Sequence, residues 1–422
     1  MKTKKKIFLS IFSVILALAL ALGGFFVGRA VYSDKELRRV KFILDTYHKY
    51  YYEESDDYLS ELVHGLMDNN SDFFTKSEYE KFYSTSSGKR NSIGVSVDSE
   101  LNVVKVAYNS PAETQGVETG GKIVKVDGTK VESITDINNA VKGKTVATYT
   151  ILYGTQEKEF TLSNKEFTET FVKYYDGENE YGFGGQKIEL IKEATSTVNG
   201  KTLPSGYSYL KYVSFMGADI NSSGWEKNLS SSVGQFMKAL EVFQNSSNKK
   251  LIIDLRDNGG GYVEAMRYLI ANFIGDENGK KLTVQKNNYK NRQEEIKSYE
   301  TKSQNYDIEK IIVLANSSTA SASEAFIGAL LDYDKANKVS VVVEYNQSRN
   351  DFSTYGKGTM QDFIFNGEKE VVKLTVAKIC FPISETCIDK KGISKNVSDK
   401  VINSVNAENQ RIDALSYVCD NF

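Results

Sequence analysis

The spacing of hydrophobic positions changes along the 422-residue chain. Residues 7–28 carry no charged side chain. Residues 32–90 repeat apolar positions at helical spacing, broken by an expected loop at "NNSDFF". Alternating or β-branched runs such as "IGVSV" then predict a small β domain over about residues 91–164, and beyond it strand and helix patterns alternate. The pattern predicts a multidomain α+β protein whose second half is a parallel or mixed sheet covered by helices.

The uncharged stretch at the N-terminus follows a basic start, "MKTKKK". As a helix, its 22 residues would reach about 33 Å, enough to cross a hydrocarbon core of about 30 Å. We therefore expect an uncleaved transmembrane anchor with the larger, C-terminal part outside the cytoplasm. A cleaved signal peptide, which would make the protein secreted, stays open because "ALALA" offers small residues for cleavage. A buried core helix is a third alternative.

Composition narrows the function classes. The formal net charge is −2, with both signs interspersed, which gives no sign of a nucleic-acid partner. The three cysteines are too few and too scattered for a metal site; Cys380 and Cys387 could bridge a short loop, or stay as thiols. The only histidines, His48 and His64, fall in the N-terminal helical patterns, and we interpret them as ordinary helix residues.

A first candidate site is "LIIDLRDNGGG", residues 251–261, where a strand pattern runs into three glycines. Glycines there would bring bare N–H groups close to a ligand, as an oxyanion hole requires. A plain flexible turn is the alternative.

A second candidate is "NSSTASASEAF", in which Ser321 and Glu324 fit an S-x-x-E capping box. Ser321 is therefore either a helix cap or a nucleophile whose oxyanion the helix N-terminus would stabilise. No histidine follows residue 64, which excludes a Ser-His-Asp triad within the α/β region. A lysine of lowered pKa could act as the base. Lys357 lies between two glycines in "YGKGTMQ", four residues before Gln361.

Taken in order, these motifs resemble the carboxyl-terminal processing proteases, or tail-specific proteases, which are serine peptidases with a Ser-Lys dyad. The resemblance runs from about residue 36 to the end of the chain. Within it, "SPAETQGVETGGKIVKVDG", residues 110–128, is similar to the family's PDZ segment, and "IGVSV" to its carboxylate-binding loop.

The resemblance implies site residues and no metal or organic cofactor. In the catalytic group, Ser321 is the nucleophile, Lys357 the general base and Gln361 the residue that orients the lysine. The implied oxyanion donors are the backbone N–H groups of Gly260 and Ala322. Binding of the substrate carboxylate is implied for the backbone of Ile93, Gly94, Val95 and Ser96.

The resemblance also implies an organisation with an α/β peptidase core of the ClpP/crotonase type. The expected parts are a basic tail and transmembrane anchor (1–31), a helical region (32–90), a PDZ domain (91–164), the serine peptidase core (165–404) and a C-terminal helix (405–422).

Three features depart from the family pattern. Gly259 stands where proline is usual, and the span from Ser321 to Lys357 is longer, with "NQSRNDFS" as an apparent insertion. Cys380 and Cys387 flank "FPISET" where the family carries a tyrosine-rich hairpin.

The implied function is a membrane-anchored, extracytoplasmic serine endopeptidase that cleaves proteins near their C-termini, its PDZ domain binding the free C-terminus of the substrate. A catalytically silent PDZ binding protein at the cell surface is the alternative, against which the presence of Ser321, Lys357 and Gln361 weighs. A hydrolase of non-protein substrates is a third reading, disfavoured by the PDZ-like segment. A homodimer is left open.

Overall fold

The computed structural model describes residues 35–50, 58–86, 89–107, 109–184, 187–192, 197–217, 220, 222–274, 281–286, 295–298, 306–367 and 370–422. The expected membrane anchor, residues 7–28, lies outside these ranges. Within them, no helix combines the length and apolar character needed to span a membrane. The chain divides into two compact units, Met1–Met67 and Asp68–Phe422.

The first unit contains two described helices, α2 (Lys35–Tyr50) and α3 (Tyr58–Leu66). His48 lies in α2, where its ring contacts Tyr58 edge to face at 4.7 Å. The expectation of one helical region over residues 32–90 needs correction, because residues from Asp68 onward belong to the second unit. The local helical pattern could not reveal this division, since it depends on long-range contacts.

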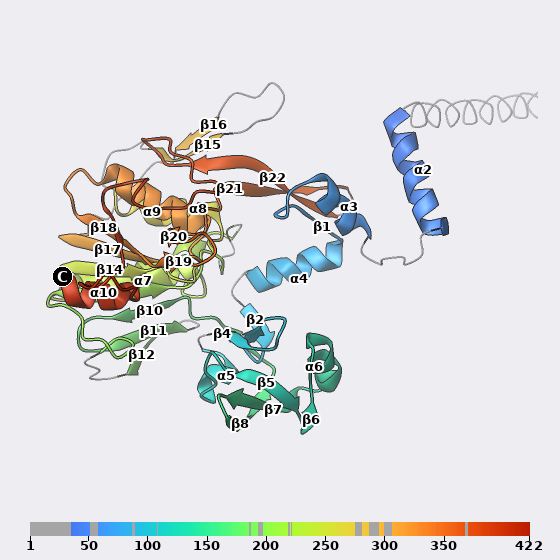
Figure 1. Ribbon diagram of the computed structural model, residues 1–422, viewed down its shortest axis with the longest axis horizontal. Helices are drawn as coiled ribbons and strands as arrows, with labels where there is room; N and C mark the ends of the chain where they lie inside the picture. Colours follow the sequence, from blue (N-terminus) through green and yellow to red (C-terminus); the bar gives the residue numbers. More distant parts are fainter. Residues whose placement is uncertain are drawn as a thin grey trace, which may run out of the picture. The chain divides into compact units, whose positions relative to one another are not determined.

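The core of the second unit is an eight-stranded sheet (Figure 1). In spatial order the strands are β12 (Lys187–Lys192), β11 (Glu180–Gly184), β10 (Val172–Tyr175), β13 (Tyr207–Tyr212), β14 (Lys250–Asp254), β17 (Lys310–Ala315), β18 (Val339–Val343) and β23 (Val401–Asn403). The last five strands of this order are parallel to one another, and the first three are joined by antiparallel pairing, so the predicted mixed sheet is confirmed.

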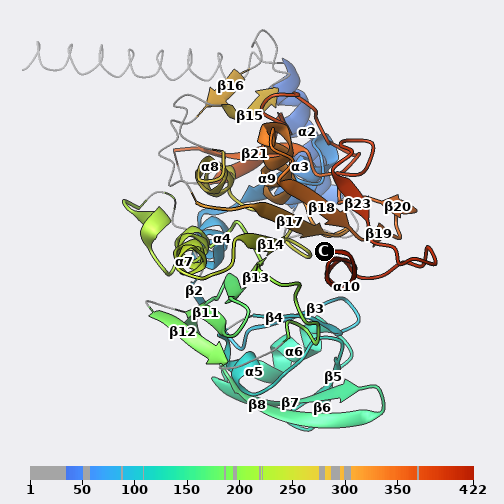
Figure 2. The same cartoon turned by 90° about the vertical axis from the view of Figure 1, so that its left-hand side faces the viewer.

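Helices lie on both faces of this sheet (Figure 2). Side chains of a strand alternate between the two faces. Leu251 and Ile253 of β14 therefore enter one hydrophobic core, whereas Ile252 enters another that includes Leu415. The first core receives the helices α7 (Ser232–Gln244), α8 (Val263–Ala271) and α9 (Ala322–Tyr333), and the second receives α10 (Ala414–Asn421).

The expected C-terminal helix over residues 405–422 is too long. Helix α10 begins at Ala414, after Asp413, whose carboxylate accepts from the Ser416 N–H at 3.0 Å and caps the helix. Val405, nine residues earlier in the chain, instead forms a β-bridge with Arg411. The capping aspartate, and not the end of the preceding strand, sets the start of the helix.

A second sheet forms around the long strand β22 (Val371–Cys380). It pairs with β21 (Thr359–Phe365), β15 (Lys281–Lys286) and β1 (Asp72–Phe74), and β16 (Glu295–Ser298) pairs with β15. The expected loop at "NNSDFF" is thus partly wrong, since its last three residues are β1. The strand exists through pairing with a distant segment, Phe73 opposite Val372, and such pairing leaves no local pattern.

The loop after β22 is closed by a disulfide between Cys380 and Cys387. This settles the alternatives that the sequence left open for these two cysteines. Phe381, within the loop, lies against α9 so closely that a Cβ added to Gly328 would be 2.0 Å from its ring. The loop therefore packs on the helix that begins at Ser321.

A small β domain precedes the core sheet. Its sheet has the order β6-β5-β7-β8, and a β3–β4 hairpin and two short helices complete it. Its elements are β3 (Val95–Val97), β4 (Val103–Val106), α5 (Pro111–Thr114), β5 (Lys122–Val126), β6 (Thr129–Lys130), α6 (Ile134–Val141), β7 (Val146–Tyr153) and β8 (Gln156–Ser163).

Two flanking strands, β2 (Lys89–Ser92) and β9 (Lys165–Thr168), pair at the ends of this domain. Directly after β9, the buried carboxylate of Glu169 forms ion pairs with Arg90 and with Lys105, each at 2.8 Å. Helix α4 (Lys76–Ser86) lies before β2 in the chain.

Candidate active site

Ser321 occupies a strained turn between β17 and α9. Its φ of 58° and ψ of −118° lie in a region that residues with a side chain rarely adopt, and such strain is typical of functional sites. Its hydroxyl makes no helix-cap hydrogen bond, whereas its backbone N–H donates to Glu324 Oε2 at 2.9 Å. The carboxylate half of the predicted capping box is therefore in place.

The glycine loop after β14 lies directly against this turn. A Cβ on Gly260, whose φ is 94°, would be 2.8 Å from Ser321 Cβ and 2.7 Å from the Ala320 carbonyl oxygen, so only glycine fits. Ser323, two residues after Ser321 and within α9, is fully buried, and its hydroxyl donates to the Asn258 carbonyl at 2.9 Å. Ser323 thus fastens the helix to the glycine loop.

The two predicted oxyanion donors differ in their present partners. The Gly260 N–H donates to Asn258 Oδ1 at 3.0 Å. Ala322 is the first residue of α9, where backbone N–H groups have no acceptor within the helix. Asn258, which our sequence reasoning missed, is fully buried and donates through Nδ2 to the Tyr212 carbonyl. Its position in "DNGGG" was the only available signal.

Lys357 is held by its own neighbours in β21. Its Nζ donates to Gln361 Oε1 at 2.8 Å and to the Thr359 carbonyl at 3.2 Å. Burial lowers the pKa of Lys357, and the positive charge of Lys373 lowers it further. The carboxylates of Asp68, Glu324 and Asp389 act in the opposite direction without cancelling the shift. The neutral form of Lys357 is therefore favoured more than that of a lysine in water.

Glu324 connects the backbones of the two segments. It is fully buried, and its Oε2 accepts from the N–H groups of both Ser321 and Lys357 at 2.9 Å. Its Oε1 accepts from the Gly356 N–H at 2.8 Å and from the Thr354 hydroxyl. Burial raises the pKa of Glu324, and these hydrogen bonds oppose that rise. The sequence alone marks Glu324 only as a capping partner of Ser321.

Ser321, Lys357 and Gln361 line a common cavity of about 370 Å³. Apolar side chains, among them Met216, Val263 and Met360, form much of its wall, together with the charged Glu264 and Lys373. Within the described structure, no hydrogen bond joins Ser321 Oγ to Lys357 Nζ.

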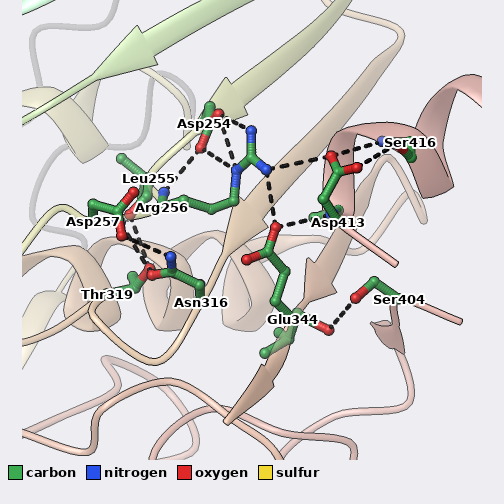
Figure 3. A network of polar contacts seen from close by, with 12 residues as sticks. Asp254, Leu255, Arg256, Asp257, Asn316, Thr319, Glu344, Ser404, Asp413 and Ser416 are labelled. Carbon is green, nitrogen blue, oxygen red and sulfur yellow. Dashed lines mark hydrogen bonds and ion pairs between the residues drawn. The ribbon is translucent and has the colours of Figure 1, made fainter. Parts of the chain in front are cut away.

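A buried ion network holds the end of β14, the strand that leads into the glycine loop (Figure 3). Asp254 accepts from the Tyr209 hydroxyl at 2.6 Å and pairs with Lys211 and Arg256 at 3.2 and 2.6 Å. Burial disfavours the charge of Asp254, but the two cations outweigh it and keep its pKa well below the ordinary value. Arg256 also reaches Glu344 at 2.9 Å, just beyond β18.

Side-chain hydrogen bonds in the same region join the loops that follow β14 and β17. The Thr319 hydroxyl donates to the Leu255 carbonyl at 2.8 Å, and Asn316 Nδ2 donates to Asp257 at 2.8 Å (Figure 3). The ion network and these bonds together fix the glycine loop against the Ser321 turn. Asp254 and Arg256 were visible in "DLRDNGGG", but nothing in the sequence pointed to their joint role.

The segment predicted to bind a carboxylate lies in the small β domain. Gly94 has a φ of 85°, and a Cβ there would be 2.1 Å from Ser110 Cβ. Its N–H donates to Ser92 Oγ at 3.2 Å. Val95 and Ser96 belong to β3, which pairs only with β4 in the part of the chain that the structure describes, so β3 presents a strand edge.

Comparison with known proteins agrees with this arrangement. Residues 206–398 match the profile of Peptidase family S41. The chain is 25% identical over 384 residues to a "Probable CtpA-like serine protease" of Staphylococcus saprophyticus, which covers 88% of this chain and 67% of the relative. It is 25% identical over 358 residues to the "Carboxy-terminal processing protease CtpA" of Bacillus subtilis, covering 82% of this chain and 65% of that protein.

The chain thus spans about two thirds of the length of these curated relatives. A solved structure, that of a Bacteroides fragilis protein assigned to the S41 proteases, superimposes with a TM-score of 0.52 at 16% identity over 82% of each chain, which supports the fold. The profile match includes Ser321 and Lys357, and the Staphylococcus relative is named a serine protease. Residues 206–398 therefore match peptidase family S41, and most of the chain is similar to carboxyl-terminal processing proteases and CtpA-like serine proteases.

Proposed function

We propose that the protein is an endopeptidase that cleaves proteins near their C-termini, with Ser321 as the nucleophile and Lys357 as the general base. The observation that carries the proposal is a strained serine at a helix N-terminus in the same cavity as a lysine of lowered pKa. A lysine can accept a proton only when neutral, and both burial and Lys373 favour that form.

The contacts of Lys357 suit a base. A neutral amine carries two N–H groups and one lone pair. Gln361 Oε1 and the Thr359 carbonyl accept the two N–H groups, which leaves the lone pair for the Ser321 hydroxyl. For the transfer, Ser321 Oγ and Lys357 Nζ must approach to hydrogen-bond distance, as catalytic groups often do only when substrate is bound.

In the acylation step, Ser321 Oγ attacks the scissile carbonyl carbon and its proton passes to Lys357 Nζ. The N–H groups of Ala322 and Gly260 would stabilise the oxyanion. Gly260 can contribute only if its N–H turns from Asn258 Oδ1 toward the substrate. Lys357 then returns the proton to the leaving amine, and water hydrolyses the acyl-enzyme with Lys357 again as base.

The small β domain is proposed to act as a PDZ domain that binds the free C-terminus of the substrate. The exposed edge of β3 can accept a peptide as an added strand, and the backbone of Ile93, Gly94, Val95 and Ser96 would receive the terminal carboxylate. The names of the curated relatives agree with action at C-termini.

We place the protein at the cell membrane, with residues 7–28 as a single-pass anchor and the peptidase outside the cytoplasm. The length of the uncharged stretch supports an anchor. The disulfide between Cys380 and Cys387 supports an oxidising compartment for the peptidase.

Comparison of protein C-termini by mass spectrometry, in cells with the native chain and in cells with Ser321→Ala, tests the function. Shortened C-termini should depend on Ser321. Identical sets of C-termini would favour the alternative of a silent binding protein.

A further inference from the structure

We propose that Thr375 and Asp68 are positioning residues for the catalytic lysine, acting through a hydrogen-bond relay that fixes the side-chain amide of Gln361. The inference rests on the proposed role of Lys357 as base and adds two residues that lie outside the sequence motifs of Ser321 and Lys357. Neither residue lines the cavity that holds Ser321.

The relay is continuous from the lysine to the aspartate. Lys357 Nζ donates to Gln361 Oε1 at 2.8 Å, and Gln361 Nε2 donates to Thr375 Oγ1 at 2.9 Å. The Thr375 hydroxyl donates to Asp68 Oδ1 at 3.0 Å. Gln361 lies on β21 and Thr375 opposite it on β22, as register partners of two paired strands. Strand pairing thus places Gln361 beside Thr375, and Lys357 lies just before β21.

The direction of the relay follows from chemistry. An ionised carboxylate can only accept hydrogen bonds, so the single hydroxyl proton of Thr375 must point to Asp68. The lone pairs of Thr375 Oγ1 then face Gln361, which has to present its NH₂ group. Burial acts against ionisation of Asp68, but hydrogen bonds from Thr375 and Ser71 outweigh it and lower its pKa, so the carboxylate form persists at neutral pH.

Orientation of the amide decides what Lys357 can do. With the NH₂ group fixed toward Thr375, the amide oxygen faces Lys357 Nζ and accepts one of its protons. In the flipped orientation the amide would offer N–H to the lysine, and a neutral amine would have to accept with its lone pair. That lone pair would then be lost to Ser321. The relay therefore keeps the base available, a role that goes beyond holding Lys357 in place.

Asp68 is itself anchored to the same strand. The Ser71 hydroxyl donates to Asp68 Oδ1 at 2.8 Å and accepts from the Thr375 N–H at 3.3 Å. The next residue, Asp72, begins β1, opposite Lys373 of β22. This explains why a short turn and a three-residue strand before α4 belong to the same compact unit as the peptidase core.

The test compares Thr375→Val with Thr375→Ser in the full chain, using a chromogenic peptide substrate. Valine keeps the shape of threonine but removes the hydroxyl, and serine keeps the hydroxyl. We expect Thr375→Val to lower kcat about tenfold and to leave KM within about twofold of the native value. The loss should be no larger, because Thr359 Oγ1 still accepts from Gln361 Nε2 at 3.2 Å and holds part of the amide's orientation. Thr375→Ser should stay within about threefold of the native kcat. In a Gln361→Ala background, Thr375→Val should have no further effect.

Asp68→Asn separates the relay from simple electrostatics. The charges that act on Lys357 are those of Lys373, Asp68, Glu324 and Asp389. The charge of the Asp68 carboxylate raises the pKa of Lys357. If Asp68 acted only through this charge, Asp68→Asn would move the acid limb of kcat to lower pH and leave the plateau unchanged. The relay predicts a lower plateau, because asparagine can also donate to Thr375 and permit the flipped amide.

Native kcat in Thr375→Val, or equal loss in Thr375→Val and Thr375→Ser, would overturn the relay while the proposed function stands. An unchanged plateau in Asp68→Asn would do the same for Asp68. Activity in Lys357→Ala would instead overturn the proposed function itself, whatever Thr375 does.

Discussion

The backbone N–H of Lys357 donates to Oε2 of the fully buried Glu324 at 2.9 Å. The same oxygen accepts the Ser321 N–H, so one carboxylate sets the distance between the segments that carry the proposed nucleophile and base. Such a carboxylate is a structural requirement of the site even though it does not line the cavity.

Glu324→Gln should therefore reduce both stability and activity. Each carboxylate oxygen accepts two donors, so an amide NH₂ at either position would face donors and leave them unpaired. We expect a loss of about 1–3 kcal/mol in the free energy of unfolding, together with a lower kcat. Urea denaturation and kcat measure the two effects. Glu309→Gln, at an exposed position, is the matched control and should change neither.

Ser321→Gly and Ser321→Ala should differ in stability although both are inactive. At a φ of 58° alanine keeps the strain of the native residue, whereas glycine does not. The glycine variant should therefore have a higher urea midpoint than the alanine variant, and its free energy of unfolding should be larger by about 1 kcal/mol. A glycine variant less stable than alanine would show that the turn is not strained.

Lys373→Met should move the acid limb of kcat/KM to higher pH. The charge of Lys373 helps to lower the pKa of Lys357, so without it Lys357 stays protonated, and inactive as a base, to higher pH. Activity should therefore fall at the acid end and recover at alkaline pH. Lys335→Met, at an exposed site in another part of the chain, should leave the profile in place. Coincident profiles for Lys373→Met and the native chain would contradict this account.

The lowered pKa of Lys357 also makes the stability of the protein depend on pH. Between its folded-state pKa and its ordinary value, the unfolded chain binds more protons than the folded chain, so the free energy of unfolding rises with pH across that interval. Lys357→Met should remove this part of the pH dependence, as measured by urea denaturation at a series of pH values.

A peptide with a free C-terminus should bind the protein more tightly than the same peptide with an amidated end. The reason is the proposed capture of the carboxylate by the backbone near Gly94, beside the open edge of β3. Calorimetry with the Ser321→Ala variant measures binding without cleavage. Equal affinities for the two peptides would remove carboxylate recognition from the account.

Much of the candidate site could be predicted from local sequence. Ser321, Lys357 and Gln361 lie in short motifs whose residue types suit their chemistry, and the structure brings all three to one cavity. The mixed sheet could be predicted as well, because its strands and helices each show their own hydrophobic period. Helix α9 follows its predicted pattern because the apolar residues after Ser321 all pack into one core.

The contacts that connect distant segments could not be predicted. Thr375 lies in an ordinary strand pattern and Asp68 in a polar turn, and only the pairing of β1 with β22 brings them together. The role of Asn258 likewise depends on the approach of Ser323, which belongs to another strand-to-helix connection. Side chains that act across such pairings have no sequence period, so no local pattern marks them.

Labelling with a serine-reactive fluorophosphonate, followed by peptide mapping in a mass spectrometer, tests the central claim most directly. The account predicts a single adduct on Ser321 of the full chain, formed faster as pH rises through the lowered pKa of Lys357, and no adduct in Lys357→Arg, because guanidinium stays protonated. An adduct on another serine, or labelling of Ser321 at the native rate in Lys357→Arg, would contradict it.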